Sequence, residues 1–139
     1  MVGYRWYHEH QVTPAFCFGA GMGYTAFSYA NLKTSETGGN VTVSVDLTNS
    51  GSTAGAEVAQ LYMSYPNSAS IGEPVRQLRG FEKVQLAAGA KATVSFSITS
   101  RDRSIWDVAS HSWKEQSGSF EIYVGASSCD LRVNGTFAA

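Results

Sequence analysis

The strict alternation of residues 41–48 constrains the fold of this chain more than any other feature. Val41, Val43, Val45 and Leu47 take every second position, and polar residues fill the positions between them. A period of two with β-branched residues predicts a strand that buries one face. Residues 92–98 alternate in the same way, and no stretch of useful length has a helical period. The sequence therefore predicts an all-β fold.

Turn signals recur along the chain and separate seven or eight short strands. We expect these strands at 41–48, 57–65, 78–86, 92–98, 105–108, 112–114, 120–124 and 131–137. Gly80 interrupts the region 78–86, where a β-bulge is expected. Short strands at this spacing favour an antiparallel two-sheet sandwich of the immunoglobulin or fibronectin type III kind, extending over residues 26–139.

Residues 1–25 have a different character, because aromatic residues crowd a segment without any regular period. Glycines alternate at positions 19, 21 and 23, but the spacing is not G-x-G-x-x-G and no Lys-Ser or Lys-Thr pair follows. A phosphate-binding loop is therefore excluded. We expect an irregular, extended arm whose glycines allow it to bend closely over a neighbouring surface. So many rings indicate that the arm is docked rather than solvated.

Composition excludes several classes of function. The 139 residues form one domain by length, and 43% hydrophobic with 15% charged residues is typical of a globular protein. A net charge of −1 gives no electrostatic basis for binding nucleic acid or an anionic membrane. No apolar run is long enough to span a bilayer, and no signal peptide is expected in this chain.

The two cysteines and two sequons bear on the cellular compartment. Cys17 and Cys129 lie 112 positions apart, so pairing cannot be deduced from spacing, and free, partly buried thiols are the favoured interpretation. Asn40 and Asn134 each begin an Asn-x-Thr triplet and are possible N-glycosylation sites.

No combination of residues predicts catalysis, a metal site or a cofactor. His8 and His10 would share one face of an extended arm, but a zinc site needs further ligands, so solvated polar residues are expected. Asp102 and Asp107 flank Trp106, as carboxylates do in some sugar sites. Charge pairing within Arg-Asp-Arg at 101–103 and a turn at Asp107 explain them more simply. No Gly-x-Ser-x-Gly nucleophile elbow is present.

Aromatic residues offer one further possibility, contact with a polysaccharide or with lignin. Tyr62, Tyr65, Trp106 and Trp113 could supply stacking rings for such a surface. The alternative is that Trp106 and Trp113 pack in or at the edge of the sandwich core, as large aromatic residues usually do. Core packing is the favoured interpretation for these two residues.

Several ordered motifs resemble the C-terminal end of glycoside hydrolase family 3 β-glucosidases. They are Gly-Tyr-Arg-Trp-Tyr at 3–7, Pro-x-Phe-x-Phe-Gly-x-Gly-x-x-Tyr-Thr at 14–25, Pro-Val-Arg-Gln-Leu-Arg-Gly-Phe-Glu-Lys-Val at 74–84 and Ser-Ile-Trp-Asp-Val at 104–108. The family usually has Pro at position 17, Leu-Ser at 22–23, and often Asp at 8 and Arg at 129. Gly-Ala-Glu-Val-Ala-Gln-Leu-Tyr at 55–62 and Tyr-Val-Gly-Ala-Ser-Ser at 123–128 look like the same family, so the resemblance extends over nearly the whole chain.

The resemblance implies a fibronectin type III-like accessory domain without catalytic residues. The family's nucleophilic Asp and acid/base Glu belong to domains outside this chain, which would be its partners in a secreted enzyme. On this reading the arm joins those catalytic domains, and the domain stabilises them and contacts substrate. The docking residues would be Tyr4, Arg5, Trp6, Tyr7, Phe16, Phe18 and Tyr24. The alternative is an independent binding module for polysaccharide or lignin.

Overall fold

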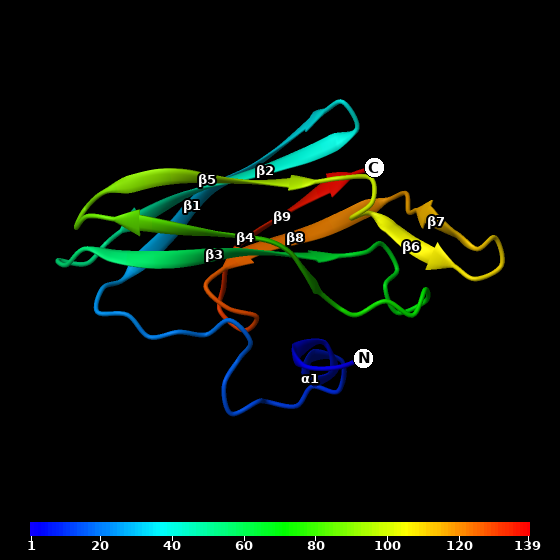
Figure 1. The fold of residues 1–139 in the computed structure, drawn as a ribbon, viewed down its shortest axis with the longest axis horizontal. Coiled ribbons are helices and arrows are strands. Elements are labelled where there is room, and N and C mark those ends of the chain that lie inside the picture. The colour runs from blue at the N-terminus through cyan, green and yellow to red at the C-terminus, as the bar shows by residue number, and fades with distance from the viewer.

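In the computed structural model, which describes residues 1–139, one short helix precedes nine strands (Figure 1). The elements are α1 (Tyr4–Glu9), β1 (Phe27–Thr37), β2 (Asn40–Asn49), β3 (Gly55–Ser64), β4 (Gln77–Leu86), β5 (Lys91–Ile98), β6 (Ser104–Asp107), β7 (Ser112–Glu115), β8 (Ser119–Gly125) and β9 (Leu131–Ala138). The helix is not long or apolar enough to cross a membrane.

The strands form two antiparallel sheets and a separate hairpin. One sheet has the order β1-β2-β5 and the other has the order β4-β3-β8-β9. The β6–β7 hairpin stands apart and projects from one end of the sandwich (Figure 1). The predicted two-sheet antiparallel sandwich is confirmed. β1 was not among the expected strands, because a register shift between Ala30 and Lys33 breaks its alternation and most of its side chains are exposed.

The core lies between the two sheets and is built from their alternating faces. Val43, Val45 and Leu47 of β2 have no exposed surface, and they belong to one hydrophobic cluster with Phe96 of β5 and Ile122 of β8. Complete burial of such a side chain stabilises the fold by about 1.5–3 kcal/mol. Truncation of Leu47 to Ala would therefore cost about 2–5 kcal/mol.

The bulge expected near Gly80 is present in β4. Leu61 pairs with Gly80 and Tyr62 pairs with Leu78, so Arg79 is the extra residue. A side chain at position 80 would press on Phe96, since an added Cβ would lie 3.0 Å from the Phe96 ring. Glycine thus allows β4 to approach the core closely while the bulge redirects the side chain of Arg79.

The N-terminal arm lies on the outer face of the β4-β3-β8-β9 sheet and is not wholly irregular. Tyr4–Glu9 forms α1, which the prediction of an extended arm missed because six residues are too few to show a helical period. The arm covers Gln60 and Tyr62 on the outer face of β3, so both are buried, whereas the buried Ser64 hydroxyl donates to the Val75 carbonyl in the β3–β4 loop. Figure 1 shows α1 and the following loop running beneath β3 and β8.

Cys17 and Cys129 form a disulfide, so the interpretation as free thiols is wrong. The bond joins the arm to the turn between β8 and β9, where the Ser128 N–H also donates to the Phe18 carbonyl at 3.0 Å. The arm's return to the sheet brings together two cysteines that are 112 positions apart. Their spacing in the sequence gave no sign of this contact.

Candidate functional site

The arm is attached to the sandwich by one inward-facing pair of rings. The Tyr4 ring stacks on Phe18 with centroids 4.9 Å apart and meets the Tyr62 ring edge-on at 5.8 Å. The Tyr4 hydroxyl accepts a hydrogen bond of 2.7 Å from the Leu78 N–H. Tyr4 therefore anchors α1 to β3 and β4, and its ring is half-buried within this chain rather than free for a partner.

A buried amide makes the second attachment. The Gln60 side chain donates to the Gly19 carbonyl at 3.2 Å and to the Ala126 carbonyl at 2.7 Å, and it accepts a 2.6 Å hydrogen bond from the Tyr62 hydroxyl. Gly19 has φ 78°, and a Cβ there would collide with the Gln60 amide. The expected close approach of the arm through a glycine is thus confirmed at Gly19. At Gly21 an added Cβ would meet nothing within 4 Å.

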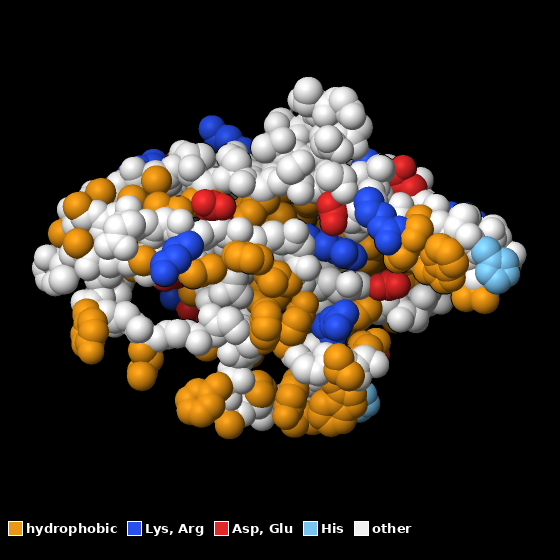
Figure 2. All heavy atoms as spheres, in the orientation of Figure 1, with side chains coloured by type: hydrophobic (Ala, Val, Ile, Leu, Met, Phe, Trp, Pro, Cys, Tyr) orange, Lys and Arg blue, Asp and Glu red, His pale blue; other side chains and the backbone are white.

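The arm also presents large apolar side chains to solvent, and we call this set of residues the arm face. It comprises Trp6, Tyr7, Phe16, Met22 and Tyr24, with exposed fractions of 39%, 36%, 90%, 104% and 102%. Figure 2 shows orange side chains along the lower rim of the molecule, where α1 and the loop run in Figure 1. Monomeric proteins rarely leave such a series of large apolar groups uncovered.

The predicted docking residues are therefore divided by the fold. Trp6, Tyr7, Phe16 and Tyr24 lie on the arm face, whereas Tyr4 packs inward. Phe18 stacks on Tyr4 yet keeps 49% of its surface exposed, and Arg5 is half-buried with a buried Nε that has no hydrogen-bond partner.

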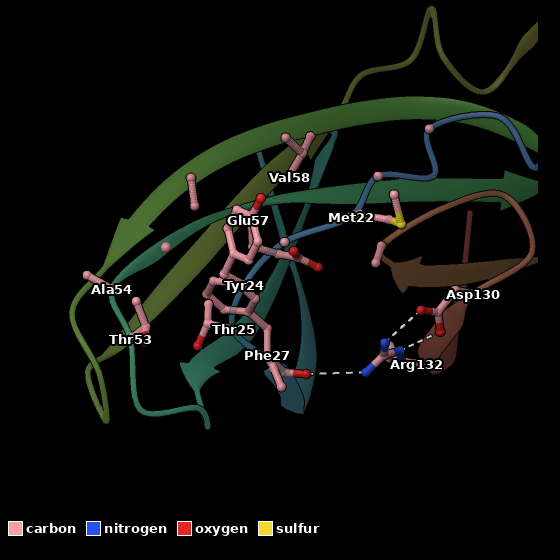
Figure 3. Close-up of a pocket in the computed structure, with 17 residues that line it drawn as sticks. Met22, Tyr24, Thr25, Phe27, Thr53, Ala54, Glu57, Val58, Asp130 and Arg132 are labelled. Atoms are coloured by element: carbon pink, nitrogen blue, oxygen red, sulfur yellow. Dashed lines mark hydrogen bonds and ion pairs between the residues drawn. The ribbon is translucent and has the colours of Figure 1, made fainter.

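A pocket of about 590 Å³ lies between the loop 19–27, the turn that begins β3 and the start of β9 (Figure 3). Arg132 reaches across it, pairing with Asp130 and donating to the Phe27 carbonyl at 3.2 Å. Tyr29 donates to Glu57 at 2.8 Å, and burial together with this carboxylate raises the pKa of Tyr29 far above its usual value. These groups satisfy one another, and the sequence predicted no site at these residues.

The second pocket, of about 350 Å³, lies beside the β6–β7 hairpin and is lined by three of the predicted contact residues, Tyr65, Trp106 and Trp113. Trp106 and Trp113 pair across the hairpin, with exposed fractions of 48% and 49% and ring centroids 5.5 Å apart. Their expected packing in or at the edge of the core is therefore wrong, because β6 and β7 belong to neither sheet. Both indoles lie at the surface.

Tyr62 and Tyr65 are unsuitable for surface contact, which corrects the prediction for these two residues. Tyr62 has no exposed surface because the arm covers it, and Tyr65 is only 4% exposed. The Tyr65 hydroxyl donates to the Asp102 carbonyl at 2.7 Å and accepts from Arg79 at 2.6 Å. Both tyrosines are structural in this chain.

The polar residues considered for catalysis or metal binding are dispersed. His8 and His10 lie on and just after α1; His10 stacks on Trp6 at 4.3 Å, while burial and then Arg76 lower the pKa of His8. No three His, Cys, Asp or Glu side chains form a group that could hold a metal ion. Asp107 accepts from the Ser110 hydroxyl, which confirms the expected turn.

The charge pairing expected within residues 101–103 is wrong. Asp102 instead accepts hydrogen bonds from the Thr99 N–H at 2.9 Å and hydroxyl at 2.7 Å. Arg103 forms an ion pair with Glu115 at 2.8 Å, and Arg101 lies over the Trp113 ring, 3.0 Å from its centroid. The β5–β6 turn thus directs each of the three charges to a different neighbour.

Known proteins contain domains similar to this chain in sequence and in structure. A family model described as "Fibronectin type III-like domain" matches residues 57–128. "Probable beta-glucosidase D" of Aspergillus niger is 44% identical, over 96% of this chain and 20% of the relative. "Beta-glucosidase cel3A" of Pyricularia oryzae is 45% identical, over 96% of this chain and 21% of the relative.

Solved structures agree with these relatives. The β-D-glucoside glucohydrolase of Trichoderma reesei superposes with a TM-score of 0.91 at 42% identity, over 97% of this chain and 22% of that one. A β-glucosidase of Streptomyces venezuelae, solved with D-glucose, has a TM-score of 0.94 at 37% identity, over 99% and 18% of the two chains.

This chain spans about a fifth of the length of the relatives that it matches. The part that corresponds is the fibronectin type III-like domain, so the catalytic residues of such an enzyme lie outside this chain, as the resemblance implies. The arm and sandwich superpose together on the solved enzymes, because the matches cover nearly all of residues 1–139. The chain belongs to the fibronectin type III-like domain family, in the form found in glycoside hydrolase family 3 β-glucosidases.

Proposed function

We propose that this chain is a non-catalytic accessory domain of a β-glucosidase, and that it docks on the catalytic domains through the arm face and stabilises them. The observation that carries the proposal is the nearly complete exposure of Phe16 and Tyr24 on an arm that is itself held to the sandwich. Burial of two such rings against a partner would contribute about 1.5–3 kcal/mol each.

Attachment and docking use different side chains of the same arm. Tyr4 and Gln60 hold the inner side, so the outer rings are presented in a fixed arrangement. A fixed surface loses little conformational entropy when it is buried, which favours a permanent contact between domains over a transient one. Arg5, whose buried Nε has no partner, would be part of the same contact.

We also propose that the parent enzyme is secreted and glycosylated. The disulfide between Cys17 and Cys129 is the kind of bond that persists in oxidising compartments. Asn40 and Asn134 are both exposed, as acceptors for N-linked glycans must be. Expression in a secreting yeast followed by endoglycosidase treatment would increase gel mobility only if these sites carry glycans.

A hybrid enzyme tests the docking proposal. This chain would replace the corresponding segment of the Trichoderma reesei glucohydrolase, and the half-life of its hydrolytic activity would be measured at elevated temperature. Substitution of Phe16 and Tyr24 by Ser should shorten the half-life several-fold, because two buried rings are lost. Val108→Ser, at a largely exposed apolar residue between β6 and β7, should leave it unchanged. Equal half-lives for all three hybrids would refute docking through the arm face.

A further inference from the structure

We propose that the pocket beside the β6–β7 hairpin binds a neutral pyranose chain of the β-glucan type. The site goes beyond docking, because no residue that lines it belongs to the arm. Its lining consists of Tyr65, Glu73, Gln77, Arg79, Arg101, Asp102, Ser104, Trp106 and Trp113. Figure 2 shows orange, blue and red side chains close together over this end of the molecule.

The aromatic part of the pocket is formed by two indole rings, of which that of Trp106 is accessible to a ligand. Trp106 pairs with Trp113 across the hairpin, and the two indoles meet at an interplanar angle of 63°. Arg101 covers the Trp113 ring, whereas nothing in the chain stacks on Trp106 apart from the edge contact with Trp113. Trp106 is therefore the ring available to stack on a ligand, and Trp113 fixes both Trp106 and Arg101.

The polar part of the pocket offers donors and acceptors that the chain leaves unused. Arg101 forms no ion pair or side-chain hydrogen bond, and Arg79 donates only to the Tyr65 hydroxyl. Glu73 accepts from Gln77 through Oε2 and leaves Oε1 free. Guanidinium and carboxylate groups side by side match a ligand whose hydroxyls both donate and accept hydrogen bonds.

Charge and shape select the class of ligand. Arg79 and Arg101 are balanced by Glu73 and Asp102, so the lining carries no net charge and favours a neutral ligand over a uronate or a phosphate. A β-linked glucosyl unit has equatorial hydroxyls, which leave flat C–H faces for Trp106 and place the hydroxyls at the rim. A polyphenol such as lignin would stack on Trp106 but would desolvate the charged groups without replacing their hydrogen bonds.

The experiment titrates the full chain with cellotetraose and follows the three indole N–H signals by NMR. We expect the Trp106 signal to shift with the oligosaccharide, while that of Trp6 on the arm stays in place. Trp106→Ala should weaken binding about tenfold, as loss of one stacked ring does. Phe81→Ala is the control, since Phe81 is 68% exposed on β4 and outside the pocket. Arg101→Ala should weaken binding without abolishing it.

Three results would overturn the proposal. The first is that the Trp106 signal does not shift at about 10 mM cellotetraose, and the second is that Trp106→Ala binds with unchanged affinity. The third is that the chain binds tetragalacturonate or a synthetic lignin polymer in preference to cellotetraose. Failure here leaves docking unaffected, because Trp106→Ala is expected to leave the half-life of the hybrid enzyme unchanged. Conversely, loss of docking in the arm-face variant should not alter the response to cellotetraose.

Discussion

Removal of the disulfide should loosen the arm on the sandwich and lower the stability of the whole chain. The perturbation is the double substitution of Cys17 and Cys129 by Ser, which keeps the size of each side chain and removes only the covalent bond. No other cysteine is present, so the double variant contains no thiol that could be oxidised or reduced.

The expected magnitude follows from the length of chain that the bond closes. A separation of 112 residues corresponds to about 4.8 kcal/mol at 25 °C in the chain-entropy treatment of the unfolded state. Measured losses of native disulfides are about 2–5 kcal/mol, and the lower part of this range is expected here. Cys17 lies in the arm, which remains attached through Gln60 and Tyr4 after the bond is gone.

Two measurements separate global from local effects. Urea unfolding of the wild type with and without reductant, and of the double variant, gives the free energy of unfolding. Hydrogen exchange of residues 1–25 reports detachment of the arm alone. Reductant should destabilise the wild type and leave the double variant unchanged, which controls for effects of the reductant itself.

The reasoning would be refuted by a small effect. If the double variant loses less than about 1 kcal/mol and residues 1–25 exchange as slowly as in the wild type, the bond neither restricts the unfolded chain nor holds the arm. Titration of two free thiols in the native, unreduced protein would also contradict the structure.

Three further predictions concern polar groups. Because burial and then Arg76 lower the pKa of His8, neutral His8 stabilises the attached arm above its usual pKa of about 6.5. The protection factors of the arm amides, which correct for the change of intrinsic exchange rate with pH, should therefore fall as pH falls below this value, but not in His8→Gln. Gln60→Leu should lower the free energy of unfolding by about 1–3 kcal/mol in urea titrations, since it strands a tyrosine hydroxyl and two carbonyls. Hydrogen bonds led by that from Asn31 lower the pKa of Asp46, so acid unfolding below about pH 4 should be shallower in Asp46→Asn.

The strands that the sequence predicted best are those that bury one face only. β2 and β5 alternate cleanly because their other faces meet solvent, so period and burial coincide. The phase of β3 was unclear for the opposite reason: Leu61 faces the core while Tyr62 faces the arm, and both are fully buried. β1 was missed because Asn31, with φ 54°, interrupts its pleat. Alternation is thus a reliable guide only where nothing covers the second face.

Aromatic content predicted that the arm is docked, but it could not assign each ring to a side. Tyr4 turns inward and Phe16 outward, and no period links their positions to their faces because the backbone between them changes from helix to loop. Phe16 directly precedes Cys17, so the disulfide that holds the arm also fixes the position of the most exposed phenylalanine. An ordered but uncovered ring does not stabilise a free-standing domain. In a domain that docks, the disulfide has already restricted the conformation of the ring, so less conformational entropy is lost when the partner binds. The position of Phe16 beside the covalent attachment therefore argues for a partner on the arm face more strongly than hydrophobicity alone.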